Sequence, residues 1–166
     1  MQYKSKACLA AEKIIEEEIK REGKISFPID PFKILKARNV IITYSDFDKL
    51  EGLLLFDKEK ESIVSINLNR PVTRQRFTAA HELGHVTLHA EIKGENFLCP
   101  IFGVKNKVEK EADEFASNLL MPTPELNKLI DKYQDENGKV DFDECLIIAE
   151  YFGVSFESCV KTIRFR

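Results

Sequence analysis

The sequence has little of what marks membrane, secreted or nucleic-acid-binding proteins. No apolar run approaches the length of a membrane-spanning helix, and the N-terminal stretch MQYKSKACLAAEKIIEEEIKREG forms no signal-peptide core. Lys and Arg total 25 against 28 Asp and Glu, and the basic residues are scattered, so the chain shows no electrostatic footprint for nucleic acid. We therefore expect a cytoplasmic protein, with neither membranes nor nucleic acid as its partner.

Cysteine is also sparse, and its spacing excludes the common cysteine frameworks. Cys8, Cys99, Cys145 and Cys159 form no CxxC pair, and no export signal favours disulfides. We interpret them as reduced thiols. The alternative concerns Cys99, which lies beside Pro100 between the histidine-containing stretch and the next acidic helix. It would then be a metal ligand or a redox switch.

The pattern of apolar residues predicts an α+β protein. A length of 166 residues with 43% hydrophobic residues fits one domain over 1–166. Helical periodicity predicts helices over 3–21, 74–90 and 108–120, with Thr73 as N-cap of the second. A short helix is expected to begin near Asp30, with Pro31 at its first position. Three more helices are expected in a tail of about 123–166. Strands are expected over 40–44, 52–56 and 62–69, forming a small antiparallel sheet.

All three histidines of the chain stand in one stretch, TAAHELGHVTLHA, at His81, His85 and His89. On a helix, residues four apart lie on nearly the same face, so His81 and His85 can converge on one ion. With Glu82 they form HExxH, in which two neutral imidazoles bind zinc and the glutamate takes a proton from water. The pattern predicts metal-assisted hydrolysis of an amide.

A plain structural interpretation stands beside this one: a buried helix whose histidines bond the backbone. The neighbouring residues favour the metal site, because they are small or apolar and would exclude water. Gly84 would let another element approach closely. His89 lies about 12 Å from His81 on a continuous helix, too far to share one ion, so a structural or outer-sphere role at the helix end is expected.

A third ligand is expected from the stretch EKEADEFASNLLMP. Glu109 and Asp113 are four apart and share a helix face, so Glu109 could bind zinc while Asp113 orients a ligand imidazole. Glu111 lies off that face and is expected to be solvated. Taken alone, the stretch favours a simple solvated acidic face.

The two motifs together resemble a known family. RFTAAHELGHVTLH followed by EKEADEFASNLLMP is similar to the ImmA/IrrE family of zinc metallopeptidases, with weaker similarity in FPIDPFKIL and IAEYFGVSFESCVKTIRF. The resemblance implies a zincin-like α+β fold with a thermolysin-like core. It also implies His81 and His85 as zinc ligands, Glu82 as general acid/base and Glu109 as third ligand. Asp113 stands where asparagine is common in the family.

The resemblance further implies what the protein acts on. The family includes proteases of phage and mobile-element repressors and a regulator of radiation responses, so we expect a zinc endopeptidase that cuts a helix-turn-helix repressor. An extended substrate could pair with GLLLF or SIVSINLN as sheet edges. Candidates for the oxyanion-stabilising residue, which sequence does not rank, are Tyr133, Tyr151, Arg76 and His89.

The rival hypothesis is a non-enzymatic, zinc-containing regulator that acts through protein or DNA binding. The stretch IAEYFGVSFESCV resembles a helix-turn-helix. Its second helix, however, would begin with Ser155, Phe156 and Glu157, which are poorly suited to sequence-specific contacts with DNA bases. A structural zinc site is usually closed by a fourth protein ligand, so Cys99 on the metal would favour the rival.

Overall fold

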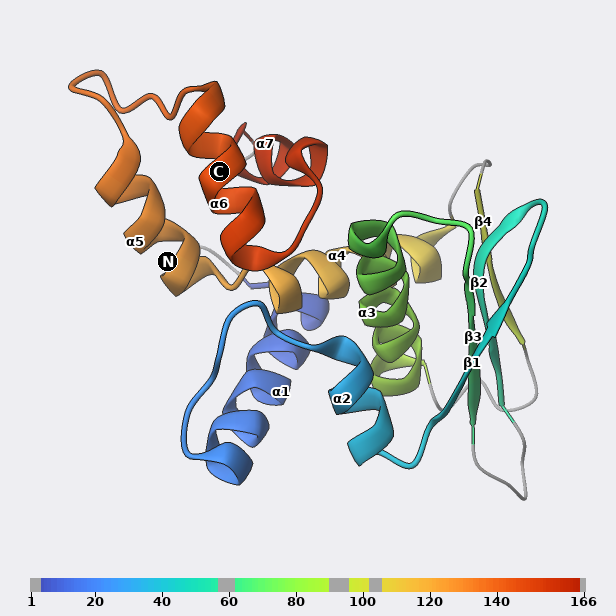
Figure 1. The fold of residues 1–166 in the computed structure, drawn as a ribbon. Coiled ribbons are helices and arrows are strands. Elements are labelled where there is room, and N and C mark those ends of the chain that lie inside the picture. The colour runs from blue at the N-terminus through green and yellow to red at the C-terminus, as the bar shows by residue number, and fades with distance from the viewer. Residues whose placement is uncertain (1–3, 57–61, 90–95, 102–105, 165–166) are drawn as a thin grey trace.

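The computed structural model describes residues 4–56, 62–89, 96–101 and 106–164, and these contain seven helices and four strands (Figure 1). The helices are α1 (Lys6–Glu22), α2 (Pro31–Ala37), α3 (Val72–Leu88), α4 (Lys107–Leu120), α5 (Thr123–Tyr133), α6 (Phe142–Phe152) and α7 (Phe156–Arg164). The strands are β1 (Ile41–Ser45), β2 (Leu50–Leu55), β3 (Ile63–Asn67) and β4 (Phe97–Pro100). The expected α+β class is confirmed.

The sheet is mixed, whereas the sequence predicted an antiparallel one. Its order is β1-β3-β2-β4, with β1 parallel to β3 and both other pairs antiparallel. The connection from β1 to β2 must therefore cross the end of β3. Asn67, buried at that end, holds it there by donating from its side-chain amide to the carbonyls of Phe47 and Leu50. The edges are β1 and β4, so the expectation that GLLLF or SIVSINLN forms an edge was wrong.

Strand β4 was not among the strands that the sequence analysis predicted. It has only four residues, too few for a periodic signal. Its burial alternates, however, since Phe97 and Cys99 are buried while Leu98 is 54% exposed. This alternation is that of a half-buried strand whose inner face covers α3.

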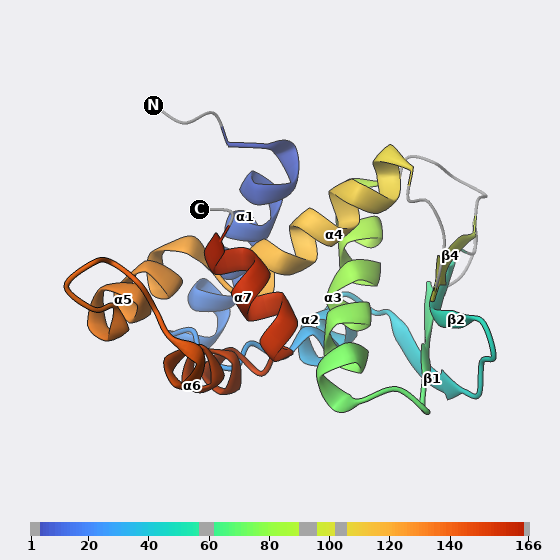
Figure 2. The ribbon, with the colours of Figure 1, turned by 90° about the horizontal axis from the view of Figure 1, so that it is seen from above.

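Helix α3 lies against the sheet and carries α4 across its other side (Figure 2). Gly84 makes this packing close, because a Cβ there would lie 3.1 Å from a Phe115 ring carbon and 3.2 Å from Cα of Ala112. The predicted N-cap was wrong: the cap position is Pro71, and Thr73 is inside the helix. The side chain of Gln75 donates to the carbonyls of Leu68 and Arg70, which holds the chain entering the helix.

Side-chain caps fix the starts of the N-terminal helices. Ser5 accepts a hydrogen bond from the backbone N–H of Cys8 and starts α1; the expected start at residue 3 lies outside the described residues. Asp30 accepts from the N–H groups of Phe32 and Lys33, with Pro31 at the first helical position as predicted.

The three tail helices are confirmed, and one side chain of α3 bonds the turn between the last two of them. Arg76 donates to the carbonyls of Gly153, Ile29 and Phe152, so it joins the α6–α7 turn and the segment before α2. The turn uses Gly153 with a positive φ of 62°. Burial lowers the pKa of the Arg76 guanidinium.

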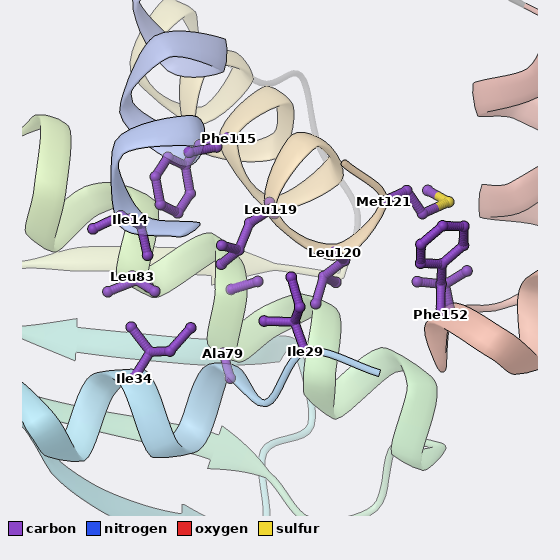
Figure 3. Packing of buried hydrophobic residues seen from close by; sticks show 14 of the residues in the cluster. Ile14, Ile29, Ile34, Ala79, Leu83, Phe115, Leu119, Leu120, Met121 and Phe152 are labelled. Carbon is purple, nitrogen blue, oxygen red and sulfur yellow. The ribbon is translucent and has the colours of Figure 1, made fainter. Parts of the chain in front are cut away.

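One hydrophobic core runs through these elements (Figure 3). Leu83 of α3 and Phe115 and Leu119 of α4 lie at its centre, and Phe152 of α6 extends it into the tail beside Met121. Among the described helices, none combines the length and apolar character needed to cross a bilayer. The core thus anchors α3 and α4, the two helices that carry the predicted site.

Candidate metal centre

Helices α3 and α4 bring the predicted site residues together. His81, Glu82 and His85 lie on α3 and are completely or almost completely buried, and Glu109 is buried in the first turn of α4. Asn106 caps α4 by accepting from the N–H of Glu109, which fixes this turn against α3.

Three side chains bring possible ligand atoms together at one point. Nε2 of His81 lies 3.1 Å from Nε2 of His85 and 3.1 Å from Oε2 of Glu109. The other carboxylate oxygen of Glu109, Oε1, lies 3.2 Å from Nε2 of His85. Tetrahedral zinc with bonds of about 2.0–2.1 Å would hold nitrogen and oxygen ligands about 3.3 Å apart. The three side chains therefore have the spacing of one face of such a coordination shell.

The hydrogen-bond partners determine which ring nitrogens face this point. Asp113 Oδ1 lies 2.9 Å from Nδ1 of His81, so that nitrogen donates to it. His89 donates from Nε2 to Glu111 (3.1 Å), which leaves its Nδ1 to accept from Nδ1 of His85 (3.0 Å). If the rings of His81 and His85 are neutral, the Nε2 atom of each carries a lone pair. Lone pairs and a carboxylate meeting at 3.1–3.2 Å repel one another unless a cation lies between them.

The electrostatics of the ion-free site also favour a positive charge. Burial opposes a charge on His81, but hydrogen bonds with Asp113, Cys99 and Glu109 outweigh it and raise its pKa well above the ordinary value. Burial lowers the pKa of His85. Burial would raise the pKa of Glu109, yet its hydrogen bonds with both histidines lower it far below the ordinary value. A bound cation would supply the charge that a proton on His81 supplies here.

Glu82 fits under the sheet because the facing strand has no side chain at that point. A Cβ on Gly52 of β2 would lie 3.3 Å from Oε1 of Glu82 and 2.5 Å from Cγ2 of Thr78. A Glu82 oxygen also lies within 4.8 Å of a ligand atom of His81. Gly52 therefore provides the room for a buried carboxylate beside the cation position, a role that the sequence analysis did not assign.

His89 and Glu111 extend the site outwards. His89 is the C-terminal cap residue of α3 and is 5% exposed, and its ring touches His85 rather than the point where the three ligand atoms meet. The expectation that Glu111 is simply solvated was wrong, because its carboxylate accepts from His89. This contact needs the crossing of α3 and α4, which no spacing within α4 reveals.

Strand β4 adds two groups to the site: Phe97, which the sequence analysis did not place there, and Cys99, which it gave as an alternative metal ligand. The Phe97 ring stacks on His85 with centroids 4.2 Å apart. Cys99 Sγ, a ligand atom of His81 and a Glu82 oxygen all lie within 4.8 Å of one another. The thiol is 5% exposed.

Three of the four candidates for oxyanion stabilisation have their hydrogen-bonding groups engaged by other residues. Arg76 donates to the three backbone carbonyls described above, and Tyr151 donates to Glu125. His89 is held between His85 and Glu111. The Lys132 ammonium lies over the Tyr133 ring, 4.8 Å from its centroid. None of these contacts orients a donor toward the cation position.

The chain is similar to proteins from bacteria and a phage. The metallopeptidase ImmA of Bacillus subtilis is 30% identical over 99 residues, covering 60% of this chain and 58% of that protein. The uncharacterized immunity region protein 2 of Bacillus phage phi105 is 30% identical over 94 residues, covering 56% and 59%. The match spans less than two thirds of either relative's length.

A solved structure and a family model complete the comparison. A Mycobacterium tuberculosis transcriptional regulator matches 95% of this chain and 46% of its own with a TM-score of 0.63 and 16% identity, which shows a shared fold alone. Residues 35–164 match the model of a peptidase family described as the IrrE N-terminal-like domain. With most of its length matched, the chain belongs to the IrrE N-terminal-like family of peptidases, and its likeness to a metallopeptidase implies a metal ion.

Proposed function

We propose that this chain is a zinc endopeptidase that cuts a helix-turn-helix transcriptional repressor of a phage or mobile element. The observation that carries the proposal is the convergence of two imidazole nitrogens and a carboxylate at 3.1–3.2 Å beside a buried glutamate. Two histidines and one glutamate are a common ligand set of catalytic zinc. The ligands are His81, His85 and Glu109, and Glu82 is the general acid/base.

The side chains divide the chemistry between them. Zinc, when bound, lowers the pKa of water and polarises the scissile carbonyl. Glu82 takes the proton of the attacking water and passes it to the leaving amine. Asp113 fixes the ring orientation of His81, and His89 with Glu111 fixes that of His85. Burial of these residues keeps other water away from Glu82.

Substrate binding would involve the sheet edge nearest the site. β4 is the last strand in the order β1-β3-β2-β4, and its inner face carries Phe97 and Cys99 against α3. An extended peptide could add to this edge through main-chain hydrogen bonds, which would align the scissile bond with Glu82.

The tail would dock the folded part of the substrate. α6 exposes four large apolar side chains, at 37–61% of their surface: Phe142, Leu146, Ile147 and Tyr151. We infer that 1–166 is one domain and that the tail helices from 123 onwards belong to it, since Phe152 and Cys159 share the core cluster with α3 and α4. Docking would raise the effective concentration of one peptide bond, so proteins without the docking surface would be cut slowly.

The test is cleavage by the zinc-loaded protein and by Glu82→Gln, with Glu16→Gln on the exposed face of α1 as matched control. Each is incubated with a candidate repressor and with casein, and products are followed by intact mass. We expect one discrete repressor cut by the wild type and the control, none by Glu82→Gln, and little cutting of casein. Cleavage of casein at many sites would contradict the docking argument.

The same experiment separates the enzyme from the non-enzymatic regulator. Glu82→Gln should retain zinc and the fold, because Glu82 is absent from the three-ligand set. A protein that holds zinc, binds the repressor or DNA and cuts nothing would refute the peptidase proposal.

A further inference from the structure

Cys99 belongs to a second group of possible ligands that shares His81 with the proposed zinc site. Its Sγ, a His81 ligand atom and a Glu82 oxygen lie within 4.8 Å of one another, and all three residues are buried. In the first group, His85 lies on α3 one turn after His81 and Glu109 comes from α4, whereas Cys99 of the second group comes from β4. Two independent elements thus supply donors around His81.

The register of the sheet explains why the thiol faces the site. Cys99 pairs with Gly52 across the β2–β4 ladder, and paired residues project from the same face. The Cβ position of Gly52 points at Thr78 and Glu82 of α3. The neighbouring Leu98 projects to the opposite face and is 54% exposed. Cys99 therefore points at α3, next to the carboxylate that would activate water.

A catalytic zinc site has three protein ligands and keeps the fourth position for water or substrate. Thiolate is a strong zinc ligand and can compete for this position. We propose that Cys99 is a fourth, exchangeable ligand of the metal centre, and that it closes the site until a substrate displaces it. The inference rests on the proposed function, since it needs the metal held by His81, His85 and Glu109.

The exchange balances without an outside reagent. When Cys99 binds, its S–H bond breaks, a sulfur–metal bond forms, and the proton is released to water, as in metal binding by any thiol. The thiolate then occupies the fourth position, which water needs for the reaction. When a substrate displaces the thiolate, sulfur takes a proton back from water. Such a latch would keep the peptidase inactive between encounters with its substrate.

The experiment uses the full chain loaded with Co²⁺, because thiolate ligation gives cobalt an intense near-ultraviolet charge-transfer absorption. We compare the wild type with Cys99→Ala and with Cys145→Ala, a buried cysteine of α6 as matched control. The band is expected in the wild type and in the control and absent from Cys99→Ala. Cys99→Ser, which keeps the side-chain size, replaces the alanine variant if that variant does not fold.

Metal affinity and cleavage rate decide whether the ligand is exchangeable. We expect Cys99→Ala to bind cobalt at least about tenfold more weakly, the lower end of what partners of metal ligands contribute. It should nevertheless cut the repressor faster once it is saturated with zinc. An unchanged or slower rate in the saturated variant would overturn the latch, as would complete loss of metal binding.

The outcomes also separate this inference from the proposed function. Stoichiometric cobalt without the charge-transfer band in the wild type would overturn the role of Cys99 and leave the three-ligand site intact. Failure of the wild type to bind cobalt or zinc would overturn both. A band that persists in Cys99→Ala would mean that another cysteine binds the metal, which also refutes the assignment.

Discussion

Gly52→Ala tests whether the missing side chain on β2 is what makes room for Glu82. The added Cβ would lie 2.5 Å from Cγ2 of Thr78, 3.1 Å from the Ser65 carbonyl oxygen and 3.3 Å from Oε1 of Glu82. The first distance is far below van der Waals contact, and Thr78 is 1% exposed. Either α3 moves away from the sheet or Thr78 changes its rotamer.

The expected cost follows from two opposing effects. Overpacking a well-packed core costs about 1–3 kcal/mol. Replacing glycine by alanine stabilises by about 0.4–1 kcal/mol through the unfolded chain, and Gly52 has no positive φ that would forbid alanine. The net loss in unfolding free energy is roughly 1–2 kcal/mol. At about 2–4 °C per kcal/mol for a chain of this size, the melting temperature falls by about 2–8 °C.

The assay is thermal unfolding of the metal-free protein followed by circular dichroism, so that metal binding does not shift the transition. Thr78→Ser removes the closest atom and should restore most of the lost stability when combined with Gly52→Ala. Thr78→Ser alone serves as the control of the double-mutant cycle. Absence of coupling between the two substitutions would refute the packing argument, and so would an unchanged melting temperature in Gly52→Ala.

Three further predictions concern the metal centre and the thiols. His81→Ala should reduce the zinc content from about one per chain to nearly none, as measured by elemental analysis. Glu109→Ala should weaken zinc binding more than Glu111→Ala does, and a larger effect of Glu111→Ala would disprove the ligand assignment. Asp113→Ala should lower zinc affinity about 10–100-fold in competition with a chelator, because it releases the His81 ring. Burial raises the pKa of Cys159 to about 12, so at pH 9 only about one Cys159 thiol in 1000 is ionised. Alkylation of Cys159 in the native protein should therefore be slow, as measured by peptide mass mapping, and rapid alkylation would contradict this prediction.

The sequence by itself determined the features that depend on local periodicity. The spacing of His81 and His85 sets their common helix face, and that of Glu109 and Asp113 sets theirs, because 3.6 residues per turn is a property of any α-helix. Asp30 and Pro31 likewise fixed the start of α2 through hydrogen bonds and dihedral preferences of adjacent residues. Such features need no knowledge of the rest of the chain.

The tertiary structure alone decided how these faces meet. The pairing of Glu111 with His89 depends on the crossing of α3 and α4, which Gly84 permits. The parallel pairing of β1 with β3 depends on Asn67 holding a distant connection. β4 is too short to be recognised by periodicity, and its register with Gly52 turns Cys99 toward the site. These contacts join residues far apart in sequence, so their energies are absent from any local pattern.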